Sequence, residues 1–330
     1  MEKQSRIEFI DILRGLSVAA VINLHSLANY LSDKYIVNLW DVQQFAVQMF
    51  VFCSAYLYFS RPDTLNRHTF FAYFKKRLAR LYIPYFAFLC IFFGFVFLLA
   101  PKTFNWEEIF KAVFVIGGID INWLVLLFIQ LAFVFPFIRY LHTRNTLLFY
   151  TYILFVVYTA GFLFFVKFPF DWKWIMWLPW SFMGLYAIFY IHFEKNKEII
   201  NLSYLYFAVI FVMFECMQYV WRGTIAIYPN KYPPNLLILS YGVVWMGIVQ
   251  FLHGIGFFQK LRVMGFVTFL SRYSYQLFFV HFVIIFIMNQ FHLDVMWPWY
   301  IYWIVLFSAT MILQKLILMT YSFLDITYRA

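Results

Sequence analysis

Three ionisable residues lie in the first long apolar segment of the chain, DILRGLSVAAVINLH, over residues 11–25. Asp11 and Arg14 are three residues apart, a spacing that allows an ion pair on one helix face. His25 follows Arg14 by eleven residues, so the two share a face roughly 16 Å apart. Charges inside a bilayer are costly and usually mark functional pathways, and imidazole is well suited to accept a proton. The stripe therefore has the pattern of a polar pathway that faces the interior of a helical bundle. The alternative for Asp11 and Arg14 is a plain helix start, with Arg14 snorkelling to the membrane surface.

A second candidate is the basic segment FFAYFKKRLARLYIPYF, over residues 70–86. Arg77 and Arg80 are three residues apart and share a helix face just before an apolar run, and Lys75 and Lys76 precede them. Because guanidinium groups hold phosphate in a bidentate manner, the pair is a candidate anion site. The alternative is a cluster of positive charge that only orients the next span in the membrane.

The third candidate is FLSRYSYQLFFVHFVII, over residues 269–285. His281 follows Ser274 by seven residues, which again places both on about one helix face, and Tyr275 lies beside Ser274. Taken alone, His281 is as consistent with a packed, hydrogen-bonded histidine as with a functional one.

The composition indicates which elements must position these residues. The chain has 330 residues, of which 65% are hydrophobic, 25% aromatic and 12% charged, and its mean hydropathy is +0.77. A soluble domain is typically about half apolar and about a quarter charged. Residues 86–100 are apolar on every face, unlike the alternating strands of a membrane β-barrel. We therefore predict an all-α, polytopic integral-membrane helical bundle, with a single domain over residues 1–330.

A helix needs about 20 predominantly apolar residues to cross a bilayer, and this rule predicts about ten spans. They cover residues 9–31, 40–60, 81–100, 122–140, 146–167, 173–191, 200–220, 236–257, 273–291 and 297–319. The second is the least regular, because Asp41, Gln43, Gln44 and Gln48 dilute its first half. Residues 109–118 are too short to span and are predicted to form a re-entrant or interfacial helix.

Lysine and arginine concentrate in one set of alternate connections, which holds Arg61, Arg67, residues 75–80, Arg139, Arg144, Lys195, Lys197, Lys260, Arg262 and Arg272. The positive-inside rule places this set, together with both termini, in the cytoplasm. In this orientation Asp11 and Arg14 lie toward the cytoplasmic side and His25 lies past the middle of the bilayer. Because Asp11 and Arg14 interrupt the first apolar run and no clear small-residue cleavage site follows it, this run is expected to be a retained helix rather than a cleaved signal peptide.

The sequence lacks the residue patterns that several classes of protein need. The net charge of +10 and the pI of about 9.3 would suggest nucleic acid in a soluble protein. Here the positive-inside rule accounts for most of that charge, so no nucleic-acid partner is expected. The seven histidines show no metal-ligand spacing, so no metal or bound cofactor is expected. Without a P-loop, ATP-driven transport by this chain alone is not expected.

Together, these segments resemble the membrane acyltransferase-3 family. IDILRGLSVAAVINLH is similar to its first-helix signature, and FVFCSAYLY, which contains Ser54, is similar to its second-helix FxxSG-type stretch. KKRLARLYIPY matches its Arg-x-x-Arg segment, WLVLLFIQLAFVFP its Trp-to-Pro helix, and SRYSYQLFFVH its late Ser-Tyr…His helix. The five segments occur in the family's order, whereas residues 146–260 match only in hydropathy.

Two departures narrow this resemblance. Ala55 stands where many members have glycine, and Phe128 and Ile129 stand where many carry acidic residues. These departures point to compact members without a soluble esterase-like domain. They also remove one candidate acid from the site.

The resemblance implies an integral-membrane O-acyltransferase of the bacterial inner (cytoplasmic) membrane. The expected donor is cytoplasmic acyl-CoA, with acetyl as the expected group, and the expected acceptor is a hydroxyl of a cell-surface polysaccharide or its precursor. His25 is expected to act as base or transient acyl carrier, with Asp11 holding Arg14. Arg77, Arg80 and Lys76 are expected at the CoA phosphates. The expected cavity-lining residues are His281, Ser274, Tyr275 and Ser54. Membrane lipids are further partners, and the oligomeric state is open, with a homodimer as one option.

A polysaccharide or small-molecule exporter is the competing hypothesis, because about ten spans with buried polar residues would also suit a transporter. Transporters often contain inverted repeats with broken helices, and the sequence has no convincing repeat. A membrane sensor is a more distant third hypothesis, since sensors usually carry a soluble output module and none is evident.

Overall fold

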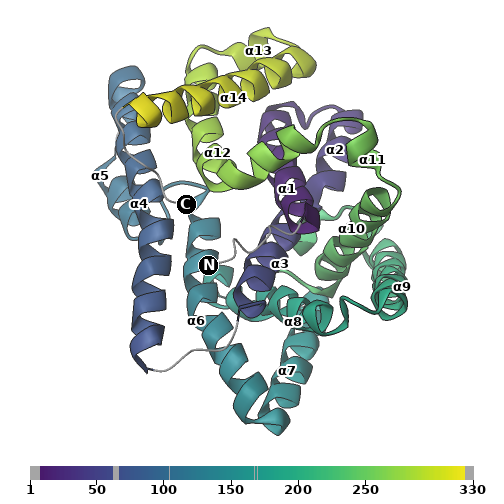
Figure 1. Cartoon of the computed structure of the whole chain (residues 1–330). Helices are drawn as coiled ribbons and strands as arrows, with labels where there is room; N and C mark the ends of the chain where they lie inside the picture. Colours follow the sequence, from purple (N-terminus) through teal and green to yellow (C-terminus); the bar gives the residue numbers. More distant parts are fainter. Residues whose placement is uncertain (1–7, 62–66, 104, 167, 169, 324–330) are drawn as a thin grey trace.

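The computed structural model describes residues 8–61, 67–103, 105–166, 168 and 170–323. This part of the chain is helical and contains no β-strand (Figure 1). Within it, 10 helical segments are long and apolar enough to cross a membrane. The predicted all-α bundle with about ten spans is therefore confirmed. The long helices are α1 (Glu8–Leu27), α2 (Lys34–Val42) with α3 (Ala46–Phe59), α4 (Arg67–Leu99), α6 (Asn122–Arg144), α7 (Thr146–Phe165), α8 (Trp177–Phe193), α9 (Lys197–Arg222), α10 (Leu236–Gly254), α12 (Met264–Gln290) and α14 (Trp299–Phe323).

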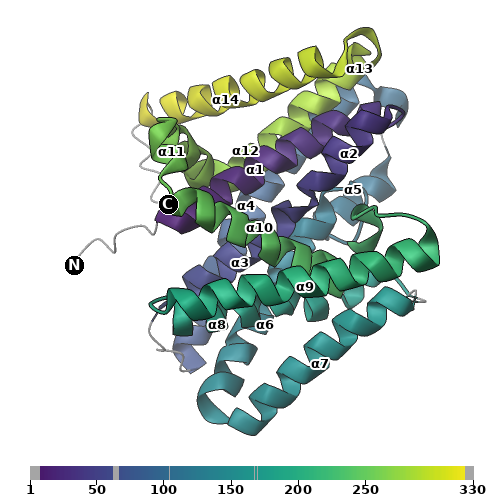
Figure 2. The same cartoon turned by 90° about the vertical axis from the view of Figure 1, so that its right-hand side faces the viewer.

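The short helices lie in the connections. They are α5 (Trp106–Val113), α11 (Phe257–Lys260) and α13 (Leu293–Met296). Figure 2 shows α11 and α13 at opposite ends of the bundle, as expected for connections that follow successive crossings. Helix α5 covers the first part of residues 109–118 and has only 8 residues. This length agrees with the prediction that residues 109–118 do not cross the membrane.

Two spans differ in detail from the prediction. Helix α4 begins at Arg67, well before the predicted start at residue 81, because lysine, arginine, leucine and alanine continue a helix readily. The basic residues Lys75, Lys76, Arg77 and Arg80 therefore lie within the helix rather than before it. The second span is broken by a 3₁₀ turn over Gln43–Phe45. Gln43 donates to the carbonyl oxygen of Leu39 over 2.7 Å and accepts from Asn23 over 2.6 Å, which satisfies polar groups at this break.

Helices α1 and α12 form the centre of the bundle, and α3 packs against α1 as well (Figure 2). Gly15 allows the close approach of α1 to α12, because a Cβ atom there would lie 2.6 Å from the carbonyl oxygen of Val267. Helices α7, α9 and α14 lie at the periphery and are mostly exposed. Their exposed side chains include large apolar residues such as Leu154 and Val209, as expected for helix faces that contact lipid.

Candidate active site

Polar side chains connect α1 and α12 along their shared face. Ser271 donates to Oδ1 of Asp11 over 2.7 Å, and both side chains are buried. One turn further on, Arg14 donates to Oγ of Ser274 over 3.1 Å. In both contacts the residue on α12 comes 260 positions after its partner on α1. Because this separation stays constant along the helices, α1 and α12 run in the same direction. The structure thus brings Asp11, Arg14 and Ser274 together and adds Ser271, which the sequence analysis did not select.

Further along the same two helices, His25 and His281 form a hydrogen-bonded pair. Nδ1 of His25 lies 2.8 Å from Nε2 of His281. The ring planes differ by 8°, and the ring centroids are 5.1 Å apart. Because the nitrogens are much closer than the centroids and the planes are nearly parallel, the rings meet edge to edge. His281 is fully buried, whereas His25 retains partial exposure.

The partners of the two histidines fix their tautomers. Nδ1 of His281 lies 3.0 Å from the carbonyl oxygen of Leu277, which can only accept, so this nitrogen carries the hydrogen. In a neutral His281, Nε2 is then an acceptor. His25 must donate from Nδ1, which leaves the lone pair of His25 Nε2 available for another group. This assignment follows from the hydrogen-bond network.

The basic segment of α4 contributes one residue to the interior. Arg77 donates to Oγ of Ser54 on α3 over 2.6 Å. Its Nε is buried and has no hydrogen-bond partner among the residues that the structure describes. Arg80 and Lys76 are exposed on the same helix, so Arg77 differs from the other two basic residues predicted with it in reaching the interior. Tyr275 donates to the carbonyl oxygen of Leu81 over 2.6 Å, which joins α12 to α4 beside Arg77.

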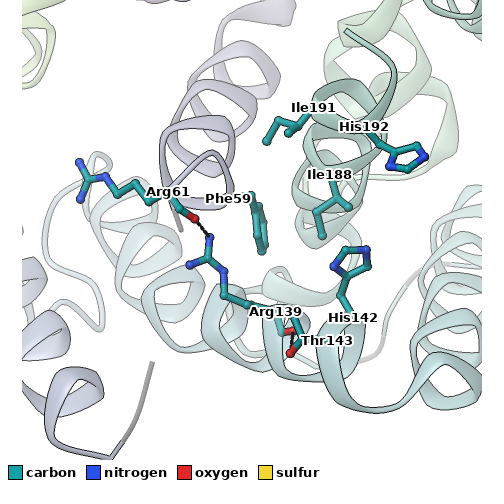
Figure 3. Close-up of a pocket in the computed structure, with 8 residues that line it drawn as sticks. All are labelled: Phe59, Arg61, Arg139, His142, Thr143, Ile188, Ile191 and His192. Atoms are coloured by element: carbon teal, nitrogen blue, oxygen red, sulfur yellow. Dashed lines mark hydrogen bonds between the residues drawn. The ribbon is translucent and has the colours of Figure 1, made fainter. Parts of the chain in front are cut away.

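Two cavities lie at opposite ends of this arrangement. A cavity of about 330 Å³ is lined by residues of α4, α12 and the segment before α6, including Asp120 and Phe282. The Phe282 ring centroid is 4.5 Å from that of His25. A cavity of about 260 Å³ lies at the ends of α3, α6 and α8 (Figure 3). Across the described residues, no group of three His, Cys, Asp or Glu side chains is placed to hold a metal ion.

Comparison with known protein families gives a match over residues 7–317 to the family described as an acyltransferase domain. The chain belongs to this acyltransferase-3 family. No curated protein and no solved structure gave a match. The protein is therefore an acyltransferase, and its apolar helices make it a multi-pass membrane protein.

Lys231 is a further candidate residue of this acyltransferase, and no sequence pattern singles it out. It lies in the connection between α9 and α10, is 5% exposed, and donates from Nζ to Oε1 of Gln44 over 3.0 Å. Burial lowers the pKa of Lys231 to about 7. Its charge acts on the His25 imidazole from the side of the bundle where α1 ends. The sequence gives no signal for this, because a buried lysine in a connection cannot be distinguished from an exposed one by spacing.

The connection that carries Lys231 is held against the bundle by a carboxylate. Asp41 accepts from the backbone nitrogens of Ile227 over 2.6 Å and Tyr228 over 2.8 Å. Two aromatic rings cover the ammonium group of Lys231, with Trp123 centred 5.6 Å away and Tyr232 centred 5.4 Å away. These contacts fix the lysine in place near the histidine pair. They also explain why Asp41 is tolerated in an otherwise apolar span.

Proposed function

We propose that this acyltransferase moves an acyl group, with acetyl as the expected group, from acyl-CoA to a hydroxyl of a cell-surface polysaccharide or its precursor. We place it in the bacterial inner membrane, with the Asp11 end of α1 toward the cytoplasm, on the basis of the loop charges. The hydrogen bond between His25 and His281 is the observation that carries the proposal. It leaves a free imidazole nitrogen inside a membrane bundle, which is what proton abstraction from a hydroxyl needs.

In the proposed reaction, Nε2 of His25 takes the proton from the acceptor hydroxyl as its oxygen attacks the thioester carbonyl carbon. A new C–O bond forms, the C–S bond breaks, and the CoA thiolate leaves. The imidazolium then returns its proton to the thiolate, so that the free thiol is released. His281 acts as a positioning residue: it accepts from Nδ1 of His25 and thereby keeps Nε2 available, as the third member of a catalytic triad does.

The donor would reach this base from the Arg77 side. The CoA phosphates are anionic, and the buried Nε of Arg77 is an N–H donor without a partner among the described residues. Arg80 and Lys76 are exposed on the same segment and would attract the anion before it binds. The thioester would then extend along the face that joins Arg14 to His25, about 16 Å along the helix.

The acceptor would approach from the opposite end. The cavity of about 330 Å³ is lined by Phe282, which also contacts His25. An acceptor hydroxyl in this cavity would therefore approach the histidine pair from the side away from Arg77. Membership of the acyltransferase-3 family favours this reading over an exporter.

The test is acyl transfer by purified protein in lipid nanodiscs, with radiolabelled acetyl-CoA and the surface polysaccharide of the source cells as acceptor. The variant His25→Ala should lose about 10²- to 10⁴-fold in transfer rate, the usual contribution of a general base. His281→Ala should also lower the rate, since Nδ1 of His25 would no longer have its acceptor. His253→Ala on α10 is the matched control and should retain the rate. If folded His25→Ala transferred the label at the wild-type rate, the proposed mechanism would be wrong.

A further inference from the structure

A cavity of about 260 Å³ at the ends of α3, α6 and α8 lies outside the site described above (Figure 3). Its ionisable lining residues are all basic: Arg61, Arg139, His142 and His192. Arg61 contributes its carbonyl oxygen, because its side chain points away from the cavity (Figure 3). A liquid water molecule occupies roughly 30 Å³, so the cavity has room for a phosphate group. The lining therefore favours an anionic ligand.

Arg139 is the buried charge of this cavity, with 7% exposure. One terminal nitrogen donates to two carbonyl oxygens at the end of α3, that of Tyr58 over 2.6 Å and that of Arg61 over 3.2 Å. The guanidinium also lies over the Tyr58 ring, 4.4 Å from its centroid. In the described part of the chain, no carboxylate lies within ion-pair distance of Arg139. A fixed guanidinium with further N–H donors is well suited to hold phosphate.

The cavity continues the Arg77 site along α3. Phe59, which lines the cavity, follows Ser54 by five residues, or about 7.5 Å along the helix, and Ser54 is the partner of Arg77. Tyr73 on α4 connects the two regions. Its ring centroid lies 5.2 Å from that of Tyr58, and it interacts electrostatically with both Arg77 and Arg139. The two positive regions are thus neighbours, with Arg139 farther from His25.

CoA carries negative charge at two places, a diphosphate within the chain and a phosphate on the ribose 3′-oxygen. We propose that the Arg139 cavity binds the ribose 3′-phosphate of the acyl-CoA donor, while Arg77 serves the diphosphate. His142 and His192 would add donors to the phosphate oxygens, since each can donate a hydrogen in its neutral state. The inference rests on the proposed function, because it takes acyl-CoA as the donor.

The experiment compares the affinities of acetyl-CoA and 3′-dephospho-acetyl-CoA for the full-length protein in phosphatidylcholine nanodiscs. The wild type should bind acetyl-CoA about ten- to hundredfold more tightly, as expected for charge-assisted hydrogen bonds to one phosphate. Arg139→Gln should bring this ratio close to one and leave the affinity for the dephospho analogue unchanged. Arg77→Gln is the matched control. This variant should lower the affinity for both ligands by a similar factor and so preserve the ratio of the two affinities.

A second variant guards against a folding defect, because Arg139 also holds the end of α3. The exposed pair His142→Gln and His192→Gln should lower the ratio without altering the affinity for the dephospho analogue. Equal binding of both ligands by the wild type would overturn the inference and leave the proposed function intact. Failure of the wild type to bind acetyl-CoA would instead overturn the proposed function.

The phosphate of an anionic lipid offers the same chemistry, so the measurement is repeated with phosphatidylglycerol in the nanodiscs. We expect the ratio to persist. If phosphatidylglycerol abolished it in the wild type but left the Arg139→Gln variant unaffected, the cavity would be a lipid site and the inference would be wrong.

Discussion

Replacing Lys231 by methionine should stabilise the protein. Lys231 is a buried cation with one side-chain hydrogen bond, to Gln44, and it has no ion-pair partner among the described residues. Methionine keeps the length of the side chain and removes the charge. The comparison therefore measures what burial of the ammonium group costs the folded state.

The magnitude follows from the pKa of Lys231, which burial lowers from 10.5 to about 7. An unfolded chain keeps this proton up to about pH 10.5, whereas the folded protein releases it near pH 7. Between these values the unfolded state binds more protons, so the free energy of unfolding rises with pH. The full difference corresponds to about 5 kcal/mol, and relaxation and water penetration reduce it. We expect Lys231→Met to gain about 2–4 kcal/mol at or below pH 7 and to lose that gain toward pH 10.5.

The assay is thermal unfolding of detergent-solubilised protein followed by tryptophan fluorescence from pH 6 to pH 10. Lys102→Met provides a matched control, because Lys102 is exposed in a connection and should shift the midpoint very little at any pH. A midpoint for Lys231→Met equal to that of the wild type at pH 7 would refute the reasoning. So would a gain that does not shrink at high pH, since it would then come from packing rather than from charge.

The same variant also tests whether Lys231 serves acyl transfer, because the charge of Lys231 acts on the His25 imidazole. A stabilised but slower Lys231→Met protein would place this lysine among the functional residues. A stabilised protein with an unchanged rate would assign it to the packing of the connection alone.

Two further predictions concern the donor side and the packing of the central helices. Arg77→Gln should weaken acetyl-CoA binding more than Arg80→Gln does, because Arg77 is bonded to Ser54 in the interior and Arg80 is exposed; unchanged affinity of both variants in titration calorimetry would return both residues to a purely orienting role. Gly15→Val should lower the unfolding midpoint by the equivalent of about 1–3 kcal/mol, because its Cβ would meet the carbonyl oxygen of Val267 at 2.6 Å. Gly94→Val, where no atom lies within 4 Å of the added Cβ, is the control and should shift the midpoint far less.

The membrane spans could be predicted because lipid imposes a length and an apolar composition on any helix that crosses it. The ends of the spans could not. Helix α4 starts at Arg67, since strong helix formers extend it beyond the apolar run. At the break over Gln43–Phe45, Gln43 is hydrogen-bonded to Asn23 of another helix, a contact that no local pattern reveals.

The stripe from Arg14 to His25 was predictable because helical periodicity places both residues on one face. Their partners were harder to predict. Ser271 and Ser274 pair with α1 only because α12 runs beside it in the same direction, a tertiary relation. The contact between His25 and His281 further depends on where the two helices approach, which Gly15 helps to set. The burial of Lys231 could not be predicted without the folded structure, because it results from a connection that folds back onto Gln44.

The direction of the two central helices explains why one face can serve both ends of the proposed reaction. Helices that cross the membrane in the same direction keep a constant offset, as Asp11 with Ser271 and Asn29 with Asn289 show. Polar residues at both ends and in the middle of α1 can therefore all find partners on a single neighbour. An antiparallel neighbour would reverse its own order of polar residues, so Ser274 and His281 could not meet Arg14 and His25 together. The first and ninth spans are both odd in number, so they cross the membrane in the same direction. Arg14 near one membrane surface and His25 deeper in the bilayer can therefore both form hydrogen bonds with α12 along one continuous helix face.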